Sequence, residues 1–317
     1  MPVLVSNSNG EDSSPAHLRE FNHCHNPTGP GGGEFCSAPD AGSGGGRAGK
    51  GSAVALMQQA LIGVKENPPR HRVHLPYALD PGMNARMQAH SDDPKVQFAY
   101  MQKNYPRVVR AAEALVASVA PAHAELQRGL TQVAQRLGFQ MHHNPEDEAA
   151  LADDNDYVFI GPLKSVSRVT TKSAKKGGDV GEVRDILRGT VAMQDLNDFP
   201  ATLHRLSEIG EILHVDDRMS KPTPGGYRDY QVILKLKTSG QLVEMLILPK
   251  PMLAAKKHGH APYEEERALP TGHPRKAQLN QFMHDLYNGA WMRSRGTRQA
   301  LAVLGSLALA LAPVVHK

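Results

Sequence analysis

The chain has 317 residues, with 36 Lys and Arg against 32 Asp and Glu, which gives a formal net charge of +4 at pH 7. This mild positive charge is compatible with nucleotide or nucleic-acid partners but does not require them. Both cysteines, Cys24 and Cys36, lie in a glycine-rich stretch, which excludes a disulfide framework for the rest of the chain and favours a reducing compartment. No basic segment followed by an apolar run is present near Met1, so we expect no secretory signal.

Residues 1–52 hold 11 of the 29 glycines and show almost no apolar periodicity, which predicts a disordered N-terminal arm. The arm contains four side chains of the kinds that bind zinc, His23, Cys24, His25 and Cys36. Their spacing does not match a tetrahedral zinc finger, so a flexible arm without metal is the interpretation we favour.

Residues 53–150 are expected to be mainly helical. A short helix is predicted over 53–66, where two prolines follow it, and residues 67–92 are expected to be irregular. From 93 to 139 apolar residues recur every three or four positions, with breaks at two prolines, which predicts helices with one buried face.

Residues 151–270 alternate between strand and helix patterns. The preceding segment, 144–156, carries six acids and no base and is expected to be a solvated connector. In chain order, the expected elements are a strand beginning at Tyr157, a basic helix over 164–176, a strand over 183–193, an amphipathic helix over 198–210, a strand over 211–219 and a strand pair over 229–237 and 241–248. This order predicts an α+β domain, a mixed β-sheet with flanking helices.

Residues 271–317 form the expected C-terminal segment. Five bases and one acid over 268–298 give it a basic character, which leans toward an RNA partner. The uncharged run over 299–315 has seventeen residues, fewer than the roughly 20 that span a bilayer. We therefore expect a buried or oligomer-facing helix there rather than a membrane anchor.

Two carboxylates stand in apolar strand patterns. Asp185 opens the apolar run over 183–193, and Glu244 interrupts the last strand. Burying a carboxylate is costly unless it binds a metal or transfers a proton, so the pair indicates magnesium and phosphate chemistry. The alternatives are that Asp185 binds backbone amides at a strand start and that Glu244 faces water on an edge strand.

Three bases, Lys164, Arg168 and Lys172, recur every four residues and so share one face of a helix. Such a face favours a bound anion, and a solvated basic helix is the alternative. Tyr227 ends a turn with two glycines at 225–226. This tyrosine either faces a ligand or closes the hairpin as a core aromatic residue.

Several motifs in order resemble one known family. They are K-S-x-x-R-x-x-x-K, D-I-L-R-G-T-V, D-R-x-x-x-P-T-x-G-G-Y-R-D and V-E-M-L-I, all within 157–267. Together they resemble RelA/SpoT-type (p)ppGpp synthetase domains, in particular the divergent toxin-like and phage-borne branch. The resemblance implies a nucleotidyltransferase-like fold and transfer of pyrophosphate from ATP to a ribose 3′-hydroxyl.

The resemblance also implies roles for the carboxylates and the tyrosine. Asp185 would hold Mg²⁺, and Glu244 would complete the metal site or deprotonate the attacking hydroxyl. Tyr227 would stack on the base of the acceptor. The triphosphate and the adenine would be bound by a set of bases: Lys164, Arg168, Lys172, Arg188, Arg218 and, from the helix after the last strand, His260, for which a plain surface histidine is the alternative.

The sequence departs from the housekeeping enzymes of this family at several positions. Pro162 stands where an Arg precedes the Lys, Thr223 replaces a Lys, Gln231 replaces a His and Leu246 replaces a Gln. These positions contact phosphate and acceptor, so the acceptor stays open between GDP or GTP, an adenine nucleotide and the 3′ end of tRNA. The residues for ATP chemistry are retained.

The N-terminal arm resembles short tags of phage head-associated proteins. The sequence therefore favours an ATP-dependent pyrophosphokinase of phage origin. With a nucleotide acceptor it would make an alarmone, and with the 3′ end of tRNA as acceptor it would act as a growth-arresting toxin. The alternative is a non-catalytic phage structural protein with a degenerate domain of this family. The expected location is the host cytoplasm or the virion, with capsid association as a further expectation.

Overall fold

The computed structural model describes residues 61, 64–65, 67–142, 152–269 and 272–294. The chain divides into two units, residues 1–47 and 48–317, and every described residue belongs to the second. The arm expected over 1–52, most of the helix expected over 53–66, and the apolar run over 299–315 lie outside the described residues.

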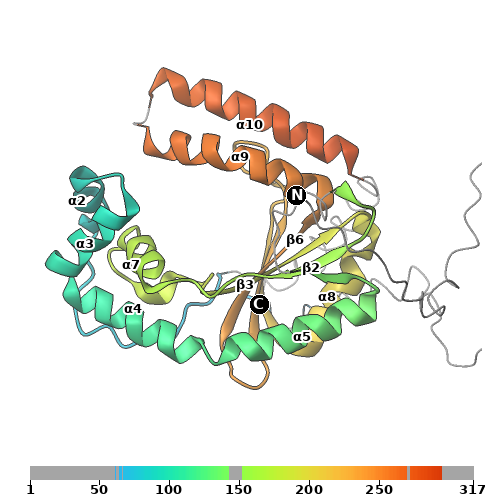
Figure 1. Ribbon diagram of the computed structural model, residues 1–317, viewed down its shortest axis with the longest axis horizontal. Coiled ribbons are helices and arrows are strands. Elements are labelled where there is room, and N and C mark those ends of the chain that lie inside the picture. Colours follow the sequence, from blue (N-terminus) through green and yellow to red (C-terminus); the bar gives the residue numbers. More distant parts are fainter. Residues whose placement is uncertain (1–60, 62–63, 66, 143–151, 270–271, 295–317) are drawn as a thin grey trace, which may run out of the picture. The chain divides into compact units, whose positions relative to one another are not determined.

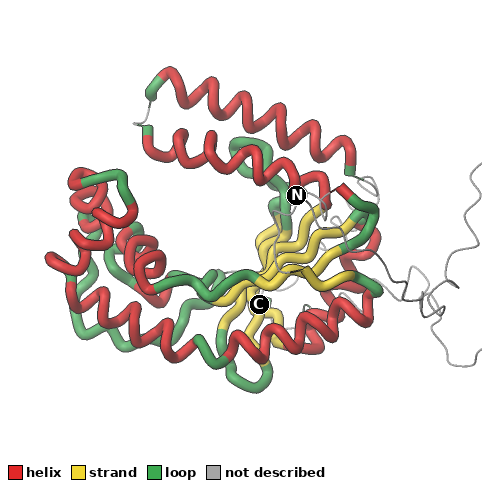
Figure 2. Tube along the Cα trace, in the orientation of Figure 1, coloured by secondary structure: helices red, strands yellow, loops and turns green. Residues whose placement is uncertain are grey.

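A six-stranded mixed sheet forms the centre of this unit (Figures 1 and 2). Its strands, in spatial order, are β1 (Gln140–His142), β2 (Tyr157–Ile160), β3 (Leu187–Met193), β6 (Leu242–Pro249), β5 (Tyr230–Leu236) and β4 (Gly210–Asp217). The pairs β1–β2 and β3–β6 are parallel, and the other neighbours are antiparallel. The α+β fold class with a mixed sheet is confirmed.

Helices pack around the sheet. They are α2 (Met83–His90), α3 (Pro94–Asn104), α4 (Pro106–Val119), α5 (Ala122–Leu137), α7 (Val166–Ala174), α8 (Phe199–Ile209), α9 (Lys250–Ala268) and α10 (Pro274–Arg293). Proline begins α3, α4 and α10, where its missing N–H group needs no partner and its fixed φ suits the first turn. The prolines that interrupt the apolar pattern thus start new helices.

The two faces of the sheet differ in chemistry. Close packing against α5 occurs on the apolar face, where a Cβ on Gly189 would lie 2.7 Å from Met245 Sδ and 2.9 Å from Leu130 Cδ1. On the opposite face, Arg188 of β3 and Glu244 of β6 are register partners, and partners across a ladder point to the same side. Helix α9, which follows β6, contacts β3 and β6. This arrangement leaves one face for the core and one for polar chemistry.

Three local expectations were wrong. Residues 67–92 contain helix α2, whose polar sequence has little apolar periodicity to reveal it. The three-residue strand β1 follows α5 and was missed because it is too short to show alternation. The strand expected over 183–193 begins only at Leu187, which leaves Asp185 in a turn ahead of it.

One hydrophobic core extends from Leu61 through α5 and the sheet to Ala290 of α10. It therefore crosses the boundaries that the sequence suggested near residues 150 and 270. Among the described residues, no helix is both long and apolar enough to cross a membrane.

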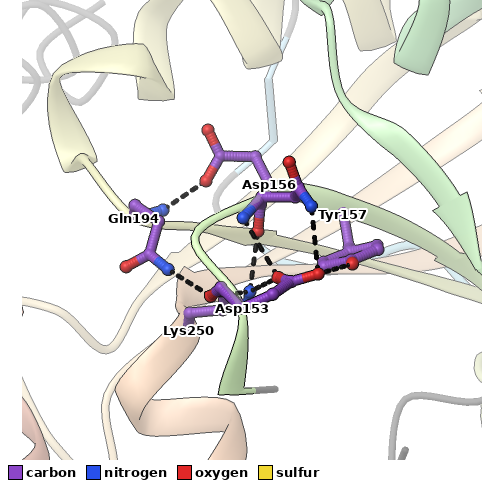
Figure 3. A network of polar contacts seen from close by, with 6 residues as sticks. Asp153, Asp156, Tyr157, Gln194 and Lys250 are labelled. Atoms are coloured by element: carbon purple, nitrogen blue, oxygen red, sulfur yellow. Dashed lines mark hydrogen bonds and ion pairs between the residues drawn. The ribbon is translucent and has the colours of Figure 1, made fainter. Parts of the chain in front are cut away.

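A buried lysine ties the loop before β2 to the start of α9 (Figure 3). Lys250 is 2% exposed, and its ammonium group donates to Asp153 Oδ1 at 2.5 Å and to the carbonyls of Asp153 and Asn155 at 2.7 and 2.8 Å. The ring of Tyr157 lies 4.8 Å from the same nitrogen. The acidic connector thus includes a structural carboxylate, Asp153, which the sequence pattern did not reveal.

His71 makes stability depend on pH. It is 4% exposed, and burial, together with the charge of Arg184, lowers its pKa from 6.5 to about 4. A histidine with a depressed pKa takes up its proton more readily in the unfolded chain. Its contribution to stability is therefore complete above the unfolded pKa and falls as pH drops toward 4. We expect a loss of about 2 kcal/mol between pH 7 and pH 5, measured by urea unfolding.

The matched variant is His71→Gln, which cannot be protonated. Other groups also titrate in this range, so the quantity to compare is the pH-dependent loss of wild type minus that of the variant. Equal losses in both proteins would contradict the role given to His71. His214, which is half-buried on the edge strand β4, provides a control whose replacement should leave the difference unchanged.

Candidate functional site

Asp185, in the turn just before β3, forms ion pairs with two lysines. Its Oδ2 lies 3.0 Å from Lys164 Nζ and 2.7 Å from Lys172 Nζ, which brings together the loop after β2, helix α7 and the turn before β3. Burial alone would raise the pKa of Asp185, but the two lysines outweigh it and hold that pKa below its usual value. Oδ1 is buried and has no hydrogen-bond partner. One oxygen is therefore available for a further positive group.

Glu244 lies on the polar face of the central strand β6. Gln231, on the neighbouring strand β5, donates a hydrogen bond from its amide to Glu244 Oε2. Burial and the nearby charge of Asp185 raise the pKa of Glu244 above its usual value, and Lys172 opposes this. The two carboxylates thus have pKa values shifted in opposite directions, which is typical of acid–base sites.

Arg188 lies on the same face of the sheet as Glu244. The two residues are direct partners across the parallel pair β3–β6. The side chain of Arg188 lies over Gly161, where a Cβ would approach its Cγ to 2.6 Å. Gly161 therefore leaves room for Arg188, and any larger residue there would displace the guanidinium.

A second polar group lies at the other end of the same face, around the loop between β4 and β5. Asp229 is completely buried, and Arg218 Nε lies 2.8 Å from its Oδ1, an ion pair without hydrogen-bond geometry. Burial raises the pKa of Asp229, against the effect of Arg218. The hydroxyl of Tyr227 is buried close by, and burial raises its pKa well above the usual value, with Asp229 adding to the effect.

A tight turn presents Tyr227. Gly226 has a φ of 84° and donates to the carbonyl of Thr223 at 2.7 Å, and Tyr227 N donates to Thr223 Oγ1 at 3.1 Å. Only glycine adopts this positive φ without strain. Thr223, which replaces a family Lys, therefore closes the turn instead of carrying a charge.

Helix α10 covers this turn. The rings of Tyr227 and Tyr287 meet edge to face, with centroids 5.3 Å apart. A Cβ on Gly225 would lie 3.3 Å from Met283 Cβ. Tyr227 thus packs against α10 at one edge, as the alternative of a core aromatic requires, and the residue as a whole is half-buried.

Two of the residues expected to bind substrate are not joined to this group by any described contact. The side chain of Arg168 is exposed on α7, although it lies one turn before Lys172. His260 is exposed on α9. Their roles stay predictions, and the structure gives Arg168 the more favourable place.

Sequence reasoning missed three members of the site. Gln231 was treated as a departure, but it is the hydrogen-bond partner of Glu244. Asp229 ends the D-R-x-x-x-P-T-x-G-G-Y-R-D motif, and its position two residues after Tyr227 is the signal that could have identified it as a site residue. Lys256 of α9 had no signal, because the charge pattern of that helix does not distinguish it from Lys257.

The residues fit a magnesium ion that is shared with a bound phosphate. Mg²⁺ is commonly held by one or two carboxylates together with substrate phosphates. Asp185 offers a buried, unpartnered oxygen, and Glu244 is close enough for the two charges to interact. Within the described residues, no group of three or more His, Cys, Asp or Glu could hold a metal by itself. A metal site made entirely of protein ligands is therefore not what these residues form.

Two cavities in the described part of the chain lie elsewhere. One of about 530 Å³ lies between residues 73–76 and helix α4, and another of about 490 Å³ lies along residues 70–74. Neither is lined by the carboxylates or by Tyr227. We place the site by its charges and contacts, because a groove that binds phosphate on an open sheet face need not be a deep cavity.

Comparison with known proteins gives structural matches alone. No protein-family model and no curated protein matches the chain. Among solved structures, small alarmone synthetase 1 from Bacillus subtilis bound to its product pppGpp is 17% identical, with a TM-score of 0.44 over 62% of this chain and 97% of that one. Small alarmone synthetase 2 from the same organism is 17% identical, with a TM-score of 0.43 over 61% and 97%.

A GTP pyrophosphokinase family protein from Streptococcus pneumoniae is 20% identical, with a TM-score of 0.41 over 60% of this chain and 96% of that one. These proteins are of the kind that the sequence motifs resemble. Because the identities and scores are low, function has to be argued from the site residues themselves.

Proposed function

We propose that this protein transfers pyrophosphate from ATP to the ribose 3′-hydroxyl of an acceptor. The observation that carries the proposal is the proximity of Asp185, in the turn before β3, to Glu244 on the adjacent parallel strand β6, with opposite pKa shifts and with lysines beside Asp185. The order of the sequence motifs supports it.

The end of the polar face near Asp185 is suited to the phosphates of ATP. Lys164, Lys172 and Arg188 bring three positive charges to it, and a triphosphate would take over from Asp185 as their partner. Asp185 and Glu244 would hold Mg²⁺ there. When bound, this ion neutralises charge on the phosphate oxygens. Arg168, one turn from Lys172, adds a fourth charge at the rim.

Glu244 is suited to receive the proton of the attacking hydroxyl. A general base works best when its pKa is closer to neutral than that of a free carboxylate, and burial shifts Glu244 in that direction. The 3′-oxygen forms a bond to the β-phosphorus, the bond from that phosphorus to the α–β bridging oxygen breaks, and AMP leaves. The proton passes to Glu244, which Gln231 holds in place.

The other end of the polar face, around Tyr227 and Arg218, is suited to the acceptor. Tyr227, a half-buried residue, offers its ring, and Arg218 adds a guanidinium plane with an unpartnered Nη2. Both groups bind a base or a phosphate well. The acceptor is a purine nucleotide or the 3′ end of tRNA. Among the bases of α10, Arg293 is exposed, whereas Arg275 and Lys276 pair with Glu265 and Glu266 of α9.

The test is to incubate the full chain with ATP labelled at its β and γ phosphates, with magnesium, and with GDP, GTP, AMP or deacylated tRNA in turn. We expect labelled product with one acceptor class in wild type. Arg168→Ala should raise the KM for ATP several-fold with little change in kcat. Lys103→Ala, an exposed lysine on another helix, should change neither.

The outcomes separate the candidate functions. Transfer to tRNA, with growth arrest on expression, would identify the toxin, and transfer to a guanine or adenine nucleotide would identify an alarmone synthetase. Wild type that transfers label to none of the acceptors would overturn the proposed function and favour the non-catalytic, phage structural alternative.

A further inference from the structure

Lys256 is a half-buried base on α9 whose neighbours come from both ends of the polar face. It lies one turn after Met252, which is completely buried against the sheet, so residues 252 and 256 share the inward face of α9. Its ammonium group is 5.5 Å from the centre of the Tyr227 ring. Helix α9 thus extends a positive charge over the polar face of β6.

The neighbours of Lys256 are charges from both ends of the site. Asp229 and Glu244 attract it, and Arg218 and Arg188 repel it. In the part of the chain that the structure describes, no side chain forms an ion pair or a hydrogen bond with its ammonium group. A half-buried ammonium group that lies among these charges and over the Tyr227 ring, without an ion-pair partner, is placed to meet an anionic ligand.

We propose that Lys256 contacts the pyrophosphoryl group as it moves from ATP to the acceptor. This inference rests on the proposed function. Asp185 and its lysines lie toward one end of the polar face and Tyr227 toward the other, while Glu244, which takes the proton, lies between them. The group in transfer must pass over Glu244, and Lys256 faces that position from α9. A cation there stabilises charge as it develops on the transferred phosphate oxygens.

The bases of the site are expected to act at different stages of the reaction. Lys164, Lys172 and Arg188 hold the donor before reaction, so their loss should act on ATP binding. Lys256 meets the phosphate oxygens most closely in the transition state, so its loss should act on kcat. The two groups of bases are therefore distinguishable by kinetics.

Protonation gives a second signature. Burial lowers the pKa of Lys256, and Asp229 and Glu244 oppose the effect. A lysine that must be charged then imposes a loss of activity as pH rises, beginning below the usual lysine range. The titratable and charged groups that face it are Asp229, Glu244, Tyr227, Arg218 and Arg188, and the pKa of Tyr227 is raised, away from this range.

The experiment compares wild type, Lys256→Met and Lys256→Arg in the labelled-ATP assay, with Lys103→Ala as an exposed lysine control. We expect Lys256→Met to lower kcat by on the order of 100-fold with less than a few-fold change in the KM for ATP. Lys256→Arg should retain part of the activity and lose the alkaline decline. The unfolding midpoint of Lys256→Met should equal or exceed that of wild type, because the variant no longer buries a charge.

Each outcome decides the question. Wild type that transfers label while Lys256→Met keeps kcat within about threefold overturns the role of Lys256 alone. A loss of activity that follows a lowered unfolding midpoint, without partial rescue by Lys256→Arg, assigns a structural role and also overturns it. Wild type without transfer to any acceptor overturns the proposed function and this inference together.

Discussion

Replacing Glu244 by Gln is expected to abolish most pyrophosphate transfer and to make the fold more stable at neutral pH. The amide cannot accept the proton of the attacking hydroxyl, so kcat should fall by roughly 10³-fold. Burial disfavours the ionised carboxylate, as the raised pKa of Glu244 shows. Removing that charge should raise the free energy of unfolding by on the order of 1 kcal/mol.

Asp185→Asn is the matched comparison. We expect it to lose as much transfer activity as Glu244→Gln, but to lower the stability of the fold where Glu244→Gln raises it. Its ionised form is favoured in the fold, and without it Lys164 and Lys172 would lie side by side with no anion between them. The free energy of unfolding should fall by about 1–3 kcal/mol. Stability curves in urea for both variants check the signs, and two variants that shift stability in the same direction would contradict the assignment.

The pH dependence of the two variants should differ as well. Asp185 stabilises the fold above the usual carboxyl pKa, and this contribution is lost as pH falls through its depressed folded pKa. For Glu244 the folded pKa is raised, so the cost of its charge disappears as pH falls. The stability gained by Glu244→Gln should therefore shrink in acid.

The second large effect is expected at Asp153. Replacing it by Ala leaves the ammonium group of Lys250 buried with backbone carbonyls as its hydrogen-bond partners. Breaking such a pair from one side costs about 3 kcal/mol, and we expect a fall of that order in the free energy of unfolding, measured in urea. Lys250→Met should cost less, because Asp153 is one-third exposed and can be hydrated.

A double variant at Asp153 and Lys250 should be less destabilised than the sum of the single changes, which defines their coupling. The control is the pair Arg275–Glu265, whose nitrogen and oxygen are 3.0 Å apart but whose side chains are both about half exposed. Its removal should cost roughly 0–1 kcal/mol. Equal effects at the two pairs would show that burial of Lys250 does not matter.

Much of the sheet could be predicted from the sequence because its central strands are apolar and bounded by turn residues. The strand pair around residues 229–248 lies within one residue of β5 and β6 at each end. The alternation that places Glu244 on one face is a local property. The four-residue spacing was misleading for Lys164: the helix expected over 164–176 begins only at Val166, so Lys164 lies in the loop before α7, while Arg168 and Lys172 are on that helix. Strand β1 was missed because three residues carry no usable period.

The contacts between distant elements could not be predicted in this way. Gln231 meets Glu244 because β5 and β6 are neighbours in register, and Lys256 meets Tyr227 because α9 runs back over the sheet. Neither relation leaves a trace in local composition. Likewise, the edge contact of Tyr287 with Tyr227 depends on how α10 packs, which no pattern within α10 reveals.

The strand order has a consequence for how the protein is made. β6 is the last strand in the sequence, yet it lies in the middle of the sheet, between β3 and β5. Until the ribosome has released residues 242–249, β3 and the β4–β5 hairpin each expose an unpaired edge, and such edges are prone to pair with other chains. A nascent chain therefore holds Asp185 long before it holds Glu244. The two carboxylates come together only when β6 closes the sheet, so a partly synthesised chain lacks the pair that the proposed transfer requires.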